Sequence, residues 1–105
     1  MAKAQIQYFP EVECEVTPSS LFDTEIVGVP DETGNHHYLR VARGVVNRQD
    51  DKTYLPVGIV EVDAPRRRAL VQLPYEADSG ANRLWVPYEK FRQIVVYPEA
   101  SESLA

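Results

Sequence analysis

The sequence has almost no cysteine and no long hydrophobic run. Its single cysteine, Cys14, cannot form a disulfide bond within the chain, which fits a reducing compartment. No apolar stretch approaches the roughly 18 residues that a membrane helix requires. Residues 1–9 also lack the apolar core of a secretory signal. We therefore expect a soluble, cytoplasmic protein with no membrane partner.

Motifs for catalysis and ligand binding are also missing. The chain contains no glycine-rich phosphate loop, no serine in a nucleophile elbow and no Cys-x-x-Cys pair. These absences favour a protein that is not an enzyme. We expect no catalytic residue, no cofactor and no bound metal ion.

The sequence lacks a basic excess as well. The net charge is −5, divided as −6 over residues 1–35, +3 over 36–72 and −2 over 73–105. A general nucleic-acid binder carries a basic excess over the whole domain. An acidic first third and a mildly basic middle do not suit that class, nor broad electrostatic binding to acidic substrates or anionic membranes.

Length and composition indicate one globular domain. A chain of 105 residues can bury one modest core but not two. Hydrophobic residues make up 44% and charged residues 26%, close to the globular average, so neither general disorder nor a fibrous architecture is indicated. We predict a single domain over 1–105, with an ordered part at 6–97 and flexible ends at 1–5 and 98–105.

Alternating residue types predict β-strands. Over residues 11–16, three glutamates alternate with Val12, Cys14 and Val16. A strand places the glutamates on one face and the apolar side chains on the other. Further strands are expected at 25–29, at 37–47 with a bulge or bend at Gly44, from 53 onward, and at 69–73, 83–86 and 93–97. The chain is therefore predicted to be all-β.

Turn-forming residues separate these strands about every ten residues. Polar loops rich in Pro, Gly, Asp and Asn occupy 30–35, 47–52 and 76–82, and a tight connection occupies 63–68. Single helical turns are expected at 21–24, capped by Ser19 or Ser20, and at 87–91, which begins with a proline. Six or seven short strands predict a sandwich or a small barrel, and we favour the barrel.

The second half of the chain carries a resemblance to a known architecture. Its order is strand, tight turn, strand, polar loop, strand, one helical turn and final strand, over segments 57–63, 69–73 and 84–91. This order resembles the SH3-like small barrels and implies an antiparallel barrel with one short helical turn near Pro87–Phe91. The signalling SH3 domains have an early ALYDY motif and a central tryptophan pair. This sequence has neither, so their proline-peptide groove is not implied here.

Several polar residues have both a chemical and a structural interpretation. His36 and His37 are adjacent, so on a strand they point to opposite faces and are poorly placed to bind one metal ion. Cys14 lies on the apolar face of its strand, where it is expected to pack as a small hydrophobe. The glutamates at 11, 13 and 15 could bind a cation or act as an acid and base pair, but they fit a solvated strand face better.

The strongest argument for a partner is the cluster Arg66–Arg68. Arginines at a strand turn could contact phosphates, and nearby aromatic rings could stack on bases, although a solubilising hairpin tip explains them too. Exposed aromatics and arginine are also the side chains that most often anchor protein interfaces. The hypothesised binding surface consists of Arg66, Arg67, Arg68, Tyr75, Trp85 and Tyr88.

We therefore expect a small non-catalytic interaction module whose partner is another protein. RNA or single-stranded DNA binding through the same residues is the first alternative. An enzyme is the second, and it would require His36, His37, Cys14 and the glutamates of 11–15 to converge in one pocket.

Overall fold

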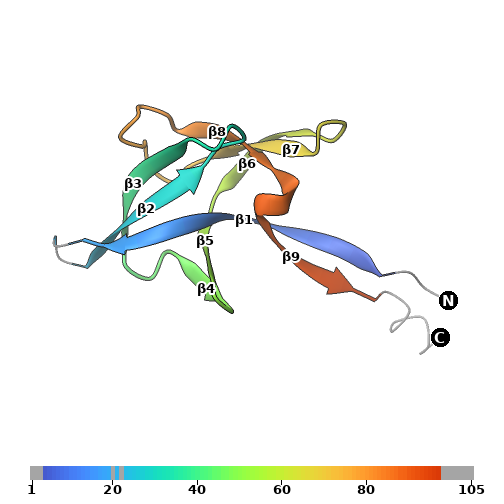
Figure 1. Cartoon of the computed structure of the whole chain (residues 1–105), viewed down its shortest axis with the longest axis horizontal. Helices are drawn as coiled ribbons and strands as arrows, with labels where there is room; N and C mark the ends of the chain where they lie inside the picture. Colours follow the sequence, from blue (N-terminus) through green and yellow to red (C-terminus); the bar gives the residue numbers. More distant parts are fainter. Residues whose placement is uncertain (1–3, 20, 22, 98–105) are drawn as a thin grey trace.

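The structure, a computed structural model, describes residues 4–19, 21 and 23–97 (Figure 1). These residues form antiparallel sheets and one short 3₁₀ helix, so the predicted all-β class is confirmed. The elements are β1 Gln5–Pro18, β2 Thr24–Pro30, β3 His36–Ala42, β4 Asn47–Gln49, β5 Lys52–Pro56, β6 Gly58–Asp63, β7 Arg68–Gln72, β8 Arg83–Pro87, η1 Tyr88–Lys90 and β9 Phe91–Val96.

The long strand β1 connects most of the larger sheet. Its residues 5–8 pair with β9, residues 11–14 with β5 and residues 15–18 with β2. Val12 is opposite both Leu55 of β5 and Phe91 of β9, so these two strands lie on opposite edges of β1. Among the described residues, one edge of β1 therefore has no partner strand over residues 5–8, on the side from which β5 approaches.

The predicted alternation in β1 is confirmed. Val12 is fully buried and Cys14 is 8% exposed, while Glu15 on the other face is exposed. The buried side chains belong to one core between the sheets, as the two-residue period of a strand requires. Its largest fully buried members are Leu39, Leu55, Val12, Val27, Val29, Val41, Val71 and Val86.

The prediction of one strand over 37–47 is wrong. β3 ends at Ala42, β4 begins at Asn47, and the chain turns between them. Gly44 has φ +96°, a conformation that side chains with a Cβ rarely adopt, and the amide of Val45 donates to the carbonyl of Ala42. Val46 on the far side of the turn is again buried, so the apolar sequence continues although the strand does not.

The smaller sheet has the order β6-β7-β8. The chain enters it through Pro56 and Val57. The amide of Val57 donates to the carbonyl of Pro10 at 2.9 Å. Beyond this bond β6 leaves β1 and pairs with β7 alone. In the part of the chain that the structure describes, the ladders form two open sheets and do not close into a barrel.

The first part of β1 and all but the base of β9 form a two-stranded ribbon that extends away from the body (Figure 1). We call residues 4–8 and 93–97 the arm. The molecule measures 54 × 30 × 19 Å. Ile6, Val95 and Tyr97 of the arm are 55–62% exposed. β1 thus begins within the predicted loose segment 1–5, whereas residues 1–3, the tail 98–105 and Ser20 of the predicted turn lie outside the described residues.

Candidate functional site

The structure separates the residues of the hypothesised binding surface into two groups. Arg66–Arg68 lie at the turn between β6 and β7, with Trp85 on β8 and Tyr88 on η1 beside them. Tyr75 is 56% exposed but follows the opposite end of β7, in the loop that leads to β8. At about 3.3 Å per residue, the length of β7 keeps Tyr75 away from the arginine turn.

Arg68 is held by other residues of the chain. Its Nε donates to Asp63 at 2.9 Å and its Nη1 to both carboxylate oxygens of Glu32 at 2.7 and 2.9 Å. Its guanidinium also lies over the Trp85 ring, 4.1 Å from the centroid. The hydrogen bond from Arg68 lowers the pKa of Asp63. Arg68 and Trp85 therefore stabilise the smaller sheet and its contact with the loop after β2.

Arg67 lies toward a cluster of aromatic rings. It has φ +51°, which places it at the tip of the turn, and its guanidinium lies 5.2 Å from the centroid of Tyr88. Its Nη2 donates to the hydroxyl of Tyr8 at 3.4 Å. The rings of Tyr8 and Tyr88 are 5.4 Å apart and tilted by 48°, a favourable aromatic arrangement.

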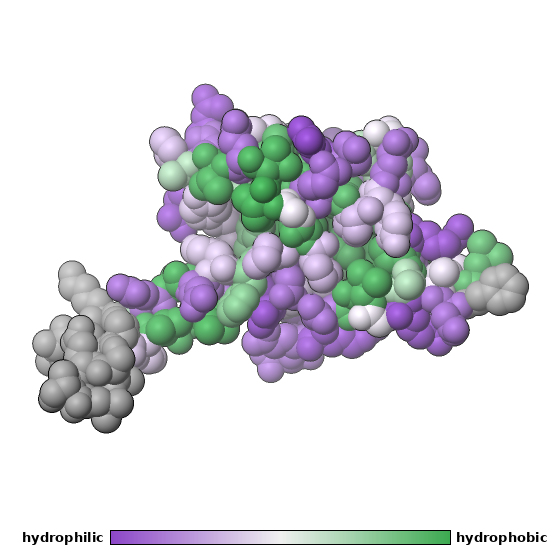
Figure 2. Space-filling model, turned by 180° about the vertical axis from the view of Figure 1, so that it is seen from behind, coloured by the Kyte–Doolittle hydropathy of each residue, from purple (hydrophilic) through white to green (hydrophobic). Residues whose placement is uncertain are grey.

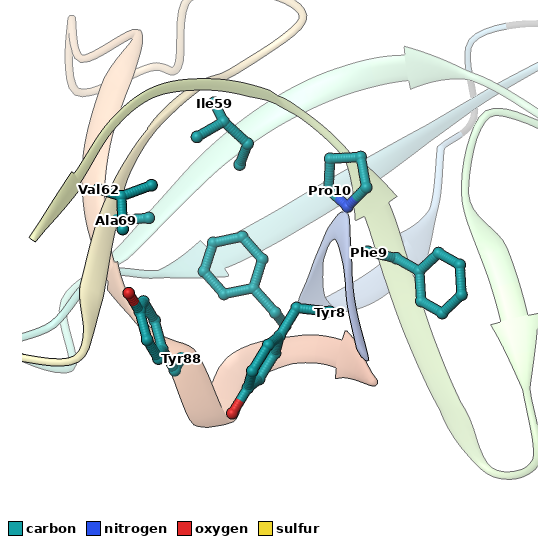
Figure 3. Close-up of a pocket in the computed structure, with 8 residues that line it drawn as sticks. Tyr8, Phe9, Pro10, Ile59, Val62, Ala69 and Tyr88 are labelled. Atoms are coloured by element: carbon teal, nitrogen blue, oxygen red, sulfur yellow. The ribbon is translucent and has the colours of Figure 1, made fainter. Parts of the chain in front are cut away.

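These rings form one wall of an apolar groove of about 380 Å³ (Figure 3). Tyr8 and Tyr88 stand on one side, and the side chains of β6 stand on the other. We call this hollow the seam groove, because it lies between the base of the arm and β6. Its main lining residues are Tyr8, Pro10, Ile59, Val62, Tyr88 and Phe91.

A β-bulge in β6 explains why the groove is apolar. Ile59 pairs with Val71 and Val62 with Ala69, so one extra residue, Val60, lies between the two pairs. The bulge places Ile59 and Val62 on the same face as the buried Val71 and Ala69. That face continues the core outward, yet Ile59 is 46% and Val62 57% exposed, because no strand of the described part of the chain covers them.

The groove also has two free strand edges. β6 pairs with β7 alone, and residues 5–8 of β1 pair with β9 alone. Within residues 4–19, 21 and 23–97 no backbone bond joins the outer edge of β6 to another element. The groove therefore offers apolar side chains together with unpaired backbone amides and carbonyls.

Sequence reasoning missed Tyr8, Pro10, Ile59 and Val62. The sequence of β6 did contain a signal. In a strand with one solvated face, Ile59, Val60 and Val62 would not all face the core, yet all three are apolar. Tyr8 carried no such signal, since its contact with Tyr88 joins positions 80 residues apart in the sequence.

Four of the residues considered for catalysis, His36, Cys14, Glu13 and Glu15, line one polar pocket, whereas His37 and Glu11 do not line it. His36 lies 3.4 Å from Glu15, whereas His37 lies in a separate contact with Asp31. Burial raises the pKa of the Cys14 thiol to about 11, which makes it a poor nucleophile. In the described part of the chain, no group of three or more His, Cys, Asp and Glu side chains could hold a metal ion.

The glutamates of β1 are paired with basic residues rather than simply solvated. Glu11 accepts from Arg92 at 3.1 Å, and Glu13 lies 2.7 Å from Lys52. Only Glu15, whose side chain is 74% exposed, keeps the solvated character expected of all three. The glutamate face therefore ties β1 to β5 and β9.

His37 bridges two loops. Its Nε2 lies 2.8 Å from Asp31 and its Nδ1 2.7 Å from the hydroxyl of Ser79. Although burial opposes it, hydrogen bonds from Thr33, His37 and Asn35 lower the pKa of Asp31 to about 2. Together with the bond from the Asp78 amide to the Tyr38 carbonyl, this contact holds the β7–β8 loop against β3. We call it the histidine clasp.

Comparison with known proteins yields no relative. The chain matches no protein-family model, no curated protein and no solved structure. In the described residues, no helix has the length and apolar character needed to span a membrane.

Proposed function

We propose that this chain is a non-catalytic interaction module that binds an extended segment of another protein in the seam groove. The observation that carries the proposal is an apolar groove that borders the free edge of β6. An extended segment can add to such an edge as a further strand. Main-chain hydrogen bonds then supply affinity, and pockets for alternate side chains supply specificity.

The groove suits a segment with apolar side chains on one face. Ile59 and Val62 are about half exposed and lie on the core face of β6, so a partner side chain would complete an unfinished core. Burying apolar surface stabilises a complex by roughly 25 cal/mol per Å² before the costs of association. Tyr8 and Tyr88 add two aromatic rings of the kind that anchor interfaces.

The arginine turn adds a charge preference at one end of the groove. Among the described residues, Arg66 and Arg67 form no ion pair with a carboxylate, whereas Arg68 forms two. An acidic residue at the end of the bound segment would give Arg67 a carboxylate partner. The preferred occupant is therefore an apolar extended segment that ends in one or more acids.

The fold that we propose for this module is an open relative of the SH3-like barrel. Three features support it: the β6-β7-β8 meander, the 3₁₀ turn η1 before the last strand, and the pairing of β9 with β1. The seam groove lies where a closed barrel would join β6 to the first strand.

Single-stranded nucleic acid is a second candidate ligand, favoured by the guanidinium of Arg67 beside two tyrosine rings. Basic groups next to stacking platforms are typical of such sites. The net charge of −5 and the ion pairs of Arg68 oppose it.

A titration followed by amide NMR tests the docking proposal. The probe is a synthetic peptide of alternating valine and threonine that ends in two glutamates. We expect shifts in the amides of β6, and no shifts from a matched peptide with proline at alternate positions, because proline lacks the donor that a strand needs. Val62→Lys should abolish the response, whereas Val95→Lys, at an equally exposed valine of the arm, should preserve it.

An oligothymidylate titrated into the same sample tests the alternative. Binding that falls linearly with the logarithm of salt concentration and disappears in Arg66→Ala/Arg67→Ala would favour nucleic acid. Peptide shifts outside β6, or shifts that survive Val62→Lys, would refute the docking proposal.

A further inference from the structure

The arm contains no charged residue. Its residues 4–8 and 93–97 include three glutamines, two tyrosines, one alanine, two isoleucines and two valines in the order A-Q-I-Q-Y and Q-I-V-V-Y. Edge strands of soluble proteins are usually protected by lysine, proline, a bulge or a covering element. In the described part of the chain none of these devices protects the arm, and Figure 2 shows apolar side chains along it.

Both faces of the arm carry apolar side chains. Ile6 is opposite Val95 on one face, and Gln7 is opposite Ile94 on the other. Ile6 and Val95 are 55% and 56% exposed, and Ile94 is 37% exposed. An isolated two-stranded ribbon is marginally stable in water, whereas three or more strands with an apolar face are stable. Within residues 4–19, 21 and 23–97, the arm therefore has two strands and fewer than a stable isolated sheet needs.

The outer edge of β9 is the part of the arm best suited to receive such strands. β9 pairs with β1 on one side only, and within the described residues its other edge meets no strand. Arg92, the nearest charge, is turned toward the body, where it contacts Glu11 and lies 3.9 Å from the Phe9 ring centroid. Residues 93–97 thus form an uncharged edge without proline.

We propose that two copies of this chain associate through their arms, with the β9 edges paired antiparallel about a twofold axis near Val95. A strand paired with its own copy about a twofold axis is necessarily antiparallel, so the operation generates one four-stranded sheet. A glutamine side chain carries both hydrogen-bond donors and an acceptor, so Gln93 can form hydrogen bonds with the β9 edge of the second copy. An uncharged edge also avoids the repulsion that two charged copies would meet.

The chemistry of the edge favours a second copy over a different partner. A partner that binds charged side chains would have none to contact on the arm, because the arm contains no charged residue. The contact is small: it pairs the five residues 93–97 of each chain, against roughly 20–30 residues a side in stable complexes, so the dimer should dissociate on dilution. The outer edge of β9 is separate from the seam groove. The dimer proposal and the docking proposal therefore do not depend on each other.

Sedimentation equilibrium of the full chain over a concentration series tests the proposal. We expect the mass to rise from 11.9 kDa toward twice that value. Because the contact is uncharged and each copy carries −5, added salt should leave the dimer unchanged or strengthen it. At about 1 mM protein, a dimer with a Kd of about 1 mM is still substantially formed. A mass that stays at that of one chain at this concentration would therefore overturn the inference. So would assemblies larger than two chains, or association that weakens with salt.

Two matched substitutions locate the contact. Val95→Lys should raise the dimer Kd at least tenfold, because it places two like charges near the axis. Val62→Lys, at a valine of β6 with 57% exposure against 56% for Val95, should leave it unchanged. Equal effects of the two lysines would contradict the arm contact.

Cysteine cross-linking gives a second measurement that does not depend on the lysine variant folding. Residues opposite one another in antiparallel strands have Cβ atoms about 4.5–5.5 Å apart, close to disulfide range. Val95→Cys should form a covalent dimer under mild oxidation, and Val62→Cys should not, while the native Cys14 is buried. Cross-linking of both variants to the same extent would also overturn the inference.

Discussion

The two ends of β1 follow different rules although they belong to one strand. Over residues 11–16, acids alternate with apolar residues, Glu11 and Glu13 pair with basic side chains, and the apolar side chains pack in or against the core. Over residues 5–8 there is no charge, and Ile6 faces solvent. The first pattern describes a strand completed within its own chain. The second describes a strand whose apolar side chains stay exposed in a single chain, and the proposed dimer would add strands beside it.

The largest effect should come from the core against which the inner half of β1 packs. Leu55 of β5 is fully buried opposite Val12. Leu55→Ala removes buried methyl groups and leaves a cavity, so we expect the free energy of unfolding to fall by about 2–5 kcal/mol. Urea denaturation measures this change. A loss below about 1 kcal/mol would show that the core of the body is loosely packed.

The next effect concerns the charged face of the same half. Glu11 accepts from Arg92 at 3.1 Å and from Asn47 at 2.9 Å, and its side chain is only 13% exposed. Glu11→Gln leaves the guanidinium of Arg92 without a carboxylate, so we expect a loss of about 1.5–3 kcal/mol in the urea experiment.

Glu15→Gln is the matched control for that substitution, because the Glu15 side chain is 74% exposed. It should change stability by less than about 0.5 kcal/mol. Similar losses for Glu11→Gln and Glu15→Gln would mean that burial does not distinguish the two ion pairs.

Acid should affect the body but not the arm. The pKa of Asp31 is lowered to about 2 in the folded chain, against about 3.9 for an unfolded aspartate. The stability that Asp31 contributes is therefore complete above about pH 4 and is lost as pH falls toward 2. Thermal melts from pH 5 to pH 2 should show a steeper fall for the wild type than for Asp31→Asn, and parallel curves would contradict this assignment.

The smallest effect is expected in the outer half of β1. Ile6→Ala removes a side chain that is 55% exposed, so the free energy of unfolding at a concentration where the chain is monomeric should change by less than about 0.5 kcal/mol. A loss comparable to that of Leu55→Ala would show that the arm packs against the body of its own chain, which would remove the contrast between the two halves of β1.

Local chemistry made several elements predictable. The alternation at 11–16, the loop at 30–35, the tight turn at 63–68 and the helical turn after Pro87 all appear in the structure. Each depends on neighbours in sequence: a two-residue period, or residues with fixed or positive φ. At Gly44 the sequence indicated a bulge or bend within one strand, whereas the structure has a turn that ends β3, and the apolar pattern hid this break because Val46 beyond it is again buried.

The composition of the candidate site was less predictable. The cluster Arg66–Arg68 looked uniform in sequence, yet Arg68 is held by Asp63 and Glu32 while Arg67 faces Tyr8 and Tyr88. Which aromatic residues lie together depended on which strand ends meet. Tyr75 follows the end of β7 that is opposite the arginine turn, so it does not join the other residues of the hypothesised surface.

The sequence by itself determined an all-β chain with one core, because residue periodicity and turn residues act over a few positions. Only the tertiary structure decided that β6 leaves β1 after Val57, that a bulge directs Ile59 and Val62 into an uncovered groove, and that the ends of β1 and β9 project as an arm. The physical reason is that strand pairing joins residues far apart in the chain, and no local pattern states which edge stays without a partner.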